Sequence, residues 1–203
     1  MIGVEGGRIQ WAHPKPHRKR PSGTEINGVK ADLCEKGDEN LAKKNKSIKT
    51  NAIRIIESEQ IQYETRSYEI ADGHNDGLSV ASKTNEPAEN VYKTLVAMAS
   101  KTDLLVFIIP VSDELDLKKA AKAAGFKKID MLPMKELTKE TGYVKGGCSP
   151  VGMKKEFPTF IDQQAQILDY LYVSAGKVGL QMKLTPSDLA QVTRAQFVNV
   201  VKD

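Results

Sequence analysis

A lysine inside an apolar strand pattern is the first residue that could take part in chemistry. Side chains alternate along a strand, so in the segment VYKTLVA Lys93 shares one face with Leu95 and Ala97. Such a lysine either faces solvent at an edge or enters a cleft. In a cleft its ammonium group can meet a phosphate, a ribose or a developing oxyanion. The strand pattern alone leaves both interpretations open.

A glycine-rich loop, TGYVKGGCSPVGMKK, spans residues 141–155. Its glycines and Pro150 exclude a regular helix or a central strand, and they favour a tight loop whose backbone N–H groups can approach a ligand. The glycines are Gly142, Gly146, Gly147 and Gly152. The GxxxxGK[ST] pattern of a phosphate-binding loop is missing, so an ordinary turn is the alternative.

Cys148 in this loop raises the question of a catalytic thiol. A thiol nucleophile usually needs a nearby base, and only His74, in the polar stretch ADGHNDG, lies beyond the N-terminal region. We therefore favour a small side chain that fills a loop position over a Cys-His hydrolase. No Cys/His spacing suits a zinc site, so the sequence predicts no metal and no cofactor.

Composition excludes several classes of protein. The 203 residues are 40% hydrophobic and 28% charged, as is usual for a soluble globular chain. The longest apolar run, residues 104–109, is far shorter than the roughly 20 residues that span a bilayer. With only two cysteines and no signal-like N-terminus, a cytoplasmic protein without a membrane partner is expected.

Basic residues are unevenly distributed along the chain. The net charge is +4, yet residues 1–50 hold 11 basic against 6 acidic side chains, and the remainder holds 19 against 20. Within that remainder, residues 118–155 hold ten lysines against three acids, a net of +7. A solvated helical face explains part of this segment, and an RNA backbone would suit it as a partner.

Two regions are expected from these patterns. Residues 1–47 have no helical or strand periodicity and contain the basic run HPKPHRKR, which predicts a disordered basic tail. An over-extended reading frame, with the natural start at Leu41, is a second hypothesis for this region. Residues 48–203 are expected to form one domain.

The pattern from residue 50 onward is that of an α/β (α+β) domain. The expected helices are residues 51–59, 78–84, 116–124, 134–142 and 186–192. The expected strands are residues 62–70, 91–99, 104–110, 127–132, 157–162, 167–174, 179–185 and 197–201. A polar turn, SKTD, joins two of the strands into a hairpin. Because strands outnumber helices and several hairpins are expected, the sheet is expected to be mixed or antiparallel, with flanking helices, and able to curl into a barrel.

Four segments in this order resemble the YbaK/EbsC family of free-standing relatives of the prolyl-tRNA synthetase editing domain. They are VYKTLVA, LDLKKAAKAAGFKKIDM, TGYVKGGCSPVGMKK and LYVSAGKVGLQMKLTPSDLAQVTRAQF. The likeness runs from about Thr50 to Val201. It implies a mixed β-barrel-like fold and a trans-editing deacylase that removes cysteine from Cys-tRNA(Pro), with Cys-tRNA(Cys) as a further candidate. Prolyl-tRNA synthetase is then a candidate partner.

The resemblance also assigns residues. It implies a catalytic set and a set that binds substrate or tRNA. The first is Lys93, Gly146, Gly147, Ser149 and Pro150, and the second is Tyr68, Thr94, Gly142, Cys148, Ser174 and Lys177. The family segment VSGGKRG is VSAGKVG here, so the contact of its arginine is not expected at Val178. Cys148 occupies a position that is commonly aliphatic.

The family chemistry needs no catalytic triad. The substrate's own thiol is thought to attack the ester carbonyl, which expels the tRNA and leaves a cyclic thiolactone, while the protein supplies proximity and oxyanion stabilisation. Lys93 is expected to anchor the terminal adenosine or its phosphate, and the N–H groups of residues 146–149 to hold the carbonyl. Two alternatives are a deacylase of Ala-tRNA(Pro) that uses water, and a tRNA-binding module without activity.

Overall fold

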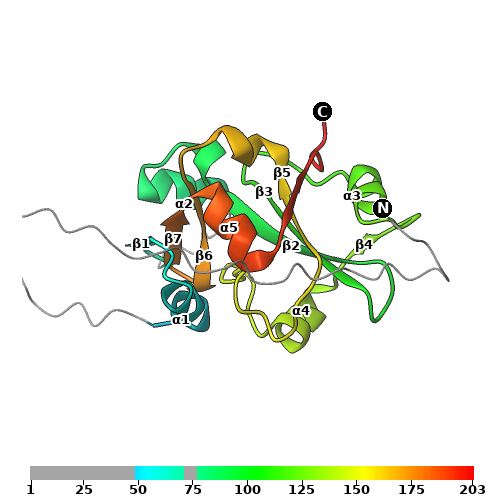
Figure 1. The fold of residues 1–203 in the computed structure, drawn as a ribbon, viewed down its shortest axis with the longest axis horizontal. Helices are drawn as coiled ribbons and strands as arrows, with labels where there is room; N and C mark the ends of the chain where they lie inside the picture. The colour runs from blue at the N-terminus through cyan, green and yellow to red at the C-terminus, as the bar shows by residue number, and fades with distance from the viewer. Residues whose placement is uncertain (1–48, 71–76) are drawn as a thin grey trace, which may run out of the picture. The chain divides into compact units, whose positions relative to one another are not determined.

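Two separate β-sheets frame the fold in a computed structural model that describes residues 49–70 and 77–203 (Figure 1). The smaller sheet is antiparallel, with strand order β1-β7-β6. Its strands are β1 (Glu64–Ser67), β6 (Leu171–Lys177) and β7 (Leu180–Leu184). A turn at residues 177–180 joins β6 and β7 into an antiparallel hairpin.

The larger sheet is mixed and has the order β4-β2-β3-β5-β8. Its strands are β2 (Tyr92–Met98), β3 (Leu104–Pro110), β4 (Asp130–Met131), β5 (Thr159–Asp162) and β8 (Gln196–Val198). The β2–β3 hairpin is antiparallel, whereas β3–β5 and β5–β8 are parallel. Strand β4 pairs with β2 only at Ala97 and Met98, so over residues 93–95 β2 has no strand partner on this side within the described chain.

Five α-helices within the described residues flank the sheets. They are α1 (Asn51–Ser58), α2 (Gly77–Thr84), α3 (Leu117–Ala123), α4 (Met134–Thr141) and α5 (Pro186–Thr193). The caps follow the sequence: the side chain of Thr50 accepts from the N–H of Ile53, and that of Asp116 from the first turn of α3. Gly142 ends α4 in the left-handed conformation that favours glycine.

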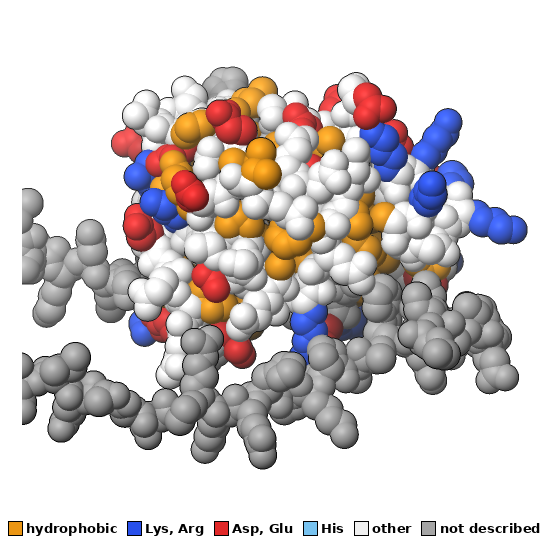
Figure 2. All heavy atoms as spheres, turned by 45° about the horizontal axis from the view of Figure 1, so that its top comes forward, with side chains coloured by type: hydrophobic (Ala, Val, Ile, Leu, Met, Phe, Trp, Pro, Cys, Tyr) orange, Lys and Arg blue, Asp and Glu red, His pale blue; other side chains and the backbone are white. Residues whose placement is uncertain are grey.

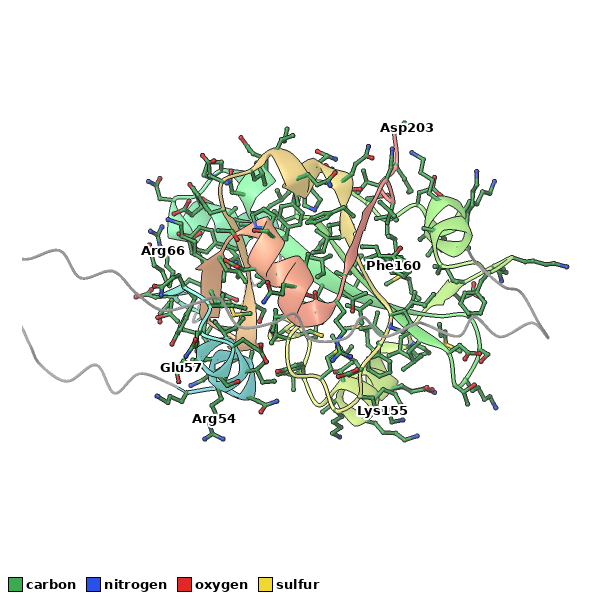
Figure 3. The ribbon with its side chains drawn as sticks, in the orientation of Figure 1. Arg54, Glu57, Arg66, Lys155, Phe160 and Asp203 are labelled. Carbon is green, nitrogen blue, oxygen red and sulfur yellow. The ribbon has the colours of Figure 1, made fainter. Side chains whose placement is uncertain are left out.

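Strand β3 lies at the centre of the core because both of its faces are covered. Leu104, Val106 and Ile108 pack with α1, β6 and β7 on one face. On the other face, Leu105, Phe107 and Ile109 pack with α3 and β5. The ring of Phe107 stacks on Phe160 with centroids 5.3 Å apart; Figure 3 labels Phe160. All seven residues of β3 are buried, which explains its uninterrupted apolar sequence.

Most expected elements are confirmed, although β1, β4 and β5 are shorter than expected, and three further differences stand out. Residues 163–167 form a 3-10 turn, η2 (Gln163–Ile167), because the Asp162 side chain accepts from the N–H of Gln164, so β6 begins only at Leu171. β8 ends at Val198, and Val201 makes only an isolated bridge to Leu115. The mixed sheet is confirmed, but it does not close into a barrel, because the strands divide between two sheets.

Two further expectations lie outside the described residues, namely the tail at 1–47 and the surroundings of His74. Among the residues that are described, no helix is both long enough and apolar enough to cross a bilayer.

Candidate active site

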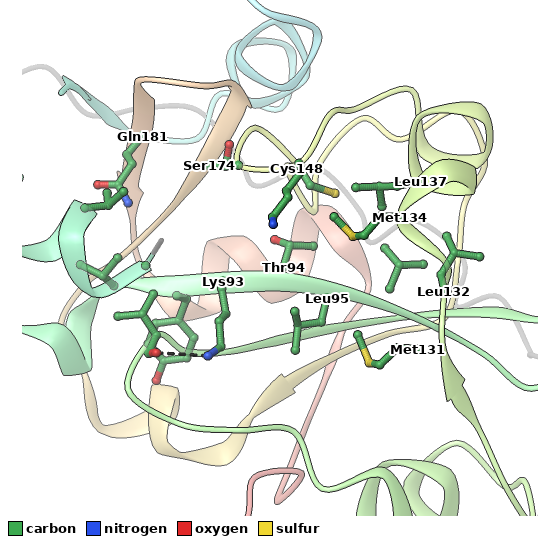
Figure 4. Close-up of a pocket in the computed structure, with 18 of the residues that line it drawn as sticks. Lys93, Thr94, Leu95, Met131, Leu132, Met134, Leu137, Cys148, Ser174 and Gln181 are labelled. Atoms are coloured by element: carbon green, nitrogen blue, oxygen red, sulfur yellow. Dashed lines mark hydrogen bonds between the residues drawn. The ribbon is translucent and has the colours of Figure 1, made fainter. Parts of the chain in front are cut away.

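A cavity of about 320 Å³ opens where strand β2 has no neighbour (Figure 4). Its walls come from β2, the glycine loop, the β6–β7 hairpin, α2 and the β4–α4 segment. Its size lies near the lower end of the roughly 300–1,000 Å³ that is usual for ligand pockets. Segments that are distant in sequence therefore meet around one short stretch of strand.

The register of β2 directs its side chains and its main chain to different sides. The N–H of Val111 donates to the Val91 carbonyl oxygen. In this register the main-chain N–H and C=O groups of the odd-numbered residues of β2 point toward β3. The main-chain N–H and C=O of Thr94 consequently point toward the open edge. The Thr94 hydroxyl oxygen is buried and has no hydrogen-bond partner among the described residues. Thr94 thus directs its main-chain groups toward the open edge, while its hydroxyl is a buried group without a partner in the described chain.

Lys93 lies on the opposite face of β2 from Thr94 (Figure 4). It is half-buried, and its Nζ donates to the Val111 carbonyl oxygen at 3.1 Å. Burial lowers the pKa of Lys93, while the nearby carboxylates of Asp113 and Glu114 oppose that shift. The lysine therefore lines the pocket as a restrained cation at the edge of the strand.

A tight turn forms the part of the glycine loop that reaches the pocket. The N–H of Gly147 donates to the Val144 carbonyl oxygen at 3.0 Å, and Gly146 has a φ of 77°, as the third position of a type II turn requires. The N–H groups of Gly146, Cys148 and Ser149 make no hydrogen bond within the described chain. Gly146 and Cys148 line the cavity, so unpaired donors lie at its wall.

Contacts within the loop and contacts from other elements hold this loop in place. The Tyr143 hydroxyl donates to the Val151 carbonyl oxygen at 2.7 Å, and Asn51 on α1 donates to the Gly152 carbonyl oxygen at 2.9 Å. A Cβ atom at Gly147 would lie 2.8 Å from the backbone nitrogen of Val178, so only glycine fits against the β6–β7 turn. The loop is therefore held on both sides, which keeps its N–H groups in position.

The Cys148 thiol is buried, and burial raises its pKa to about 12. It is therefore neutral near pH 7, and a neutral thiol is a weak nucleophile. The described residues contain no cluster of three or more His, Cys, Asp or Glu side chains arranged to bind a metal ion. The polar groups at the pocket can thus bind and polarise a substrate, but Cys148 is poorly suited to attack it.

Residues 78–192 match the sequence profile of the aminoacyl-tRNA editing domain. The chain belongs to the aminoacyl-tRNA editing domain family. It is also 42% identical over 160 residues to the Enterococcus faecalis protein EbsC, named as a candidate Cys-tRNA(Pro)/Cys-tRNA(Cys) deacylase. That match covers 79% of this chain and 98% of the relative. The resemblance to the YbaK/EbsC family is thereby confirmed.

Other proteins and solved structures that resemble this editing domain share less of its sequence. YwhH of Bacillus subtilis, an uncharacterised protein, is 26% identical over 103 residues, which covers 50% of this chain and 65% of the relative. A crystal structure of a candidate trans-editing enzyme for prolyl-tRNA synthetase has a TM-score of 0.65 at 20% identity and covers 77% of this chain and 100% of its own. The crystal structure of a hypothetical protein has a TM-score of 0.69 at 18% identity and covers 75% of this chain and 100% of its own. These two structures support the fold.

The pocket of this editing domain collects about half of the residues that the resemblance implied. Those that line it are Tyr68, Lys93, Thr94, Gly146, Cys148 and Ser174. The remaining five, Gly142, Gly147, Ser149, Pro150 and Lys177, lie outside the lining. Ser149 is fully buried, and its hydroxyl accepts from the N–H of Val151 at 3.2 Å. The structure thus places several of the loop residues behind the pocket wall.

The sequence reasoning missed Gln181. It lies on β7 directly opposite Ser174 on β6, and both residues line the pocket. The residue is 5% exposed, and its side-chain carbonyl oxygen Oε1 has no partner among the described residues. A polar residue between two apolar ones in a buried strand is a signal that could have identified it.

The departure at Val178 also has a structural consequence. Its side-chain methyl groups lie 3.9 Å from the position that a Cβ atom would take at Gly146. Val178 therefore lies beside Gly146, where a side chain at position 146 would meet it.

Proposed function

We propose that this editing domain is a trans-editing deacylase that removes cysteine from mischarged Cys-tRNA(Pro), with Cys-tRNA(Cys) as a second candidate substrate. The family, the name of the E. faecalis relative and the description of the similar crystal structure support this proposal. The observation that carries it is the set of unpaired loop N–H groups at the cavity wall, beside the open edge of β2. Such donors suit an ester carbonyl that gains negative charge.

The aminoacyl ester would lie with its carbonyl oxygen toward the N–H groups of Gly146 and Cys148. These donors would stabilise the oxyanion that forms during attack on the carbonyl carbon. Loss of one such donor typically lowers the rate by about 10²–10³. The contacts that hold the loop therefore serve the chemistry, because a displaced N–H group would lose most of this effect.

The substrate's own thiol would be the nucleophile. Its sulfur forms a bond to the ester carbonyl carbon, the bond from that carbon to the ribose oxygen breaks, and the thiol proton ends on the ribose hydroxyl. The products are tRNA and a cyclic thiolactone, and no electrons are gained or lost. The neutral state of Cys148 supports this route over attack by a thiol of the protein.

The unpaired polar atoms would bind the rest of the aminoacyl group. An α-ammonium group needs acceptors, and the buried oxygens of Thr94 and Gln181 are acceptors without partners in the described chain. Lys93 would anchor the terminal adenosine through its ribose, after exchanging its hydrogen bond with the Val111 carbonyl for one with the substrate.

Deacylation assays with Cys-tRNA(Pro), Ser-tRNA(Pro) and Ala-tRNA(Pro) test the proposal. We expect Cys-tRNA(Pro) to be cleaved fastest and Lys93→Ala to reduce kcat/KM by about tenfold or more, as for a lost hydrogen bond from a charged group. Lys101→Ala, at an exposed lysine between β2 and β3 that lies outside the pocket lining and the lysine-rich segment, is the matched control. Full activity in Lys93→Ala would refute its role. Equal rates for the cysteine and serine substrates would instead indicate attack by water.

A further inference from the structure

Two exposed methionines flank the entrance of the pocket. Met131 is 42% exposed and Met134 is 54% exposed, although both line the cavity. Met131 lies opposite Ala97 in the β2–β4 pairing, which places it on the Lys93 face of the sheet. Met134, in the first turn of α4, lies on the Thr94 side (Figure 4). Apolar side chains therefore stand on both sides of the open strand edge.

A lysine completes this entrance. Lys145 lines the cavity and occupies the second position of the turn at residues 144–147, so its side chain is exposed. It forms no ion pair within the described part of the chain. We call Met131, Met134 and Lys145 the rim.

The rim belongs to the lysine-rich segment at residues 118–155, and basic side chains gather over α3 in the same segment (Figure 2). Two of its three acids are already near lysines: Asp130 lies 3.0 Å from Lys128, and Glu140 lies 3.5 Å from Lys155. The segment that supplies the rim therefore carries a net positive charge, as an anionic partner requires.

We propose that the rim binds the 3′-terminal nucleotide of an RNA, with its unstacked base between Met131 and Met134 and its phosphate on Lys145. Proteins read single-stranded RNA ends by packing splayed bases on side chains and by placing cations on phosphates. Methionine suits the first task because its flexible, polarisable thioether packs well against aromatic rings.

The inference rests on the proposed function in taking aminoacyl-RNA as the ligand. If the ester lies at the glycine loop, the base on the same terminal ribose must leave through the entrance that the rim surrounds. The Lys145 side chain at the rim favours a nucleotide over an apolar peptide as its occupant.

Binding of an RNA hairpin that ends in 3′-CCA and carries no amino acid tests the contact with the base. Fluorescence anisotropy would compare hairpins with a terminal adenine or a terminal abasic site. For the wild type we expect the hairpin with the abasic end to bind more weakly than the hairpin with the terminal adenine. Each methionine that contacts the base should contribute about two- to tenfold to this difference. In the variant Met131→Ala/Met134→Ala the two ends should bind equally. Ile167→Ala, at an 88% exposed apolar residue, should retain the difference.

The outcomes separate this inference from the proposed function. Equal affinity of both ends for the wild type would overturn the inference, as would an unchanged difference in the double variant. Because the RNA carries no amino acid, binding that depends on the terminal base can persist in a protein without deacylase activity. That result would uphold the rim and refute the proposed activity.

The salt dependence of the same binding tests the contact with the phosphate. Lys145→Ala should reduce the slope of log K against log salt by about 0.7, the value for one single-strand phosphate contact. Arg54→Ala is the control because Arg54 is an exposed cation on α1 that projects away from the fold (Figure 3). An unchanged slope in Lys145→Ala would overturn the phosphate contact.

Discussion

The glycine loop and the open edge of β2 form two walls of one pocket, yet they use their polar groups differently. In and around the loop, the Tyr143 hydroxyl, the Asn51 amide and the Ser149 hydroxyl all make hydrogen bonds that hold the loop. Across the pocket, the hydroxyl of Thr94 and the Oε1 atom of Gln181 are buried without partners in the described chain.

This difference separates two tasks within one site. A buried polar atom without a partner costs about 1–3 kcal/mol of stability, so the fold has no reason of its own to leave one there. A bound substrate can supply the missing hydrogen bond. We therefore expect substitutions in the loop to lower both stability and activity. Substitutions at Thr94 and Gln181 should lower activity alone.

The largest expected effect is that of Gly147→Ala. The new Cβ would lie 2.8 Å from the backbone nitrogen of Val178, and a backbone atom cannot move aside cheaply. We expect a loss of about 1–3 kcal/mol in unfolding free energy by urea titration. Displacement of the loop N–H groups should also reduce kcat/KM by about 10²–10³. Gly125→Ala, strained at a φ of 76° but outside the pocket lining, should lower stability without changing kcat/KM.

A smaller and more selective effect is expected for Thr94→Val. The valine has the same shape but lacks the unpaired hydroxyl, so unfolding free energy should stay equal or rise, while kcat/KM falls about two- to tenfold. Tyr143→Phe is the matched removal of a hydroxyl in the loop. It should lower the unfolding free energy by about 1–3 kcal/mol because the buried Val151 carbonyl loses its donor. Equal stability losses in the two variants would contradict the division of tasks.

The smallest effect on activity is expected at Cys148. Because burial raises its pKa from 9.0 to about 12, the folded state keeps the thiol protonated. The stability that this provides is fully present below pH 9 and declines as the pH rises toward 12. At pH 8 iodoacetamide should label Cys148 about 10³-fold more slowly in the native protein than in urea, by mass spectrometry of its peptide. Cys148→Ala should keep kcat/KM within about twofold; a larger loss would indicate a direct chemical role.

Much of the fold follows from local patterns. Thr50 and Asp116 cap their helices, Gly142 ends α4, and the apolar run at residues 104–110 forms the buried strand β3. One error occurred where a local turn competed with a strand pattern. Asp162 caps the 3-10 turn η2, which delays the start of β6, and no periodicity in ILDYLYVS reveals that competition.

The sequence by itself determined the element types, the family and the positions of Lys93 and the glycine loop, because these depend on residue types at short spacing. Only the tertiary structure decided which loop residues face the pocket and which face the core. Gly146 and Cys148 line the cavity, whereas Gly147 and Ser149 pack behind it against the β6–β7 turn and the loop itself. The tertiary structure also revealed Gln181 and the rim. Both depend on how strands far apart in the chain pair, and on the edge of β2 that no other described strand covers.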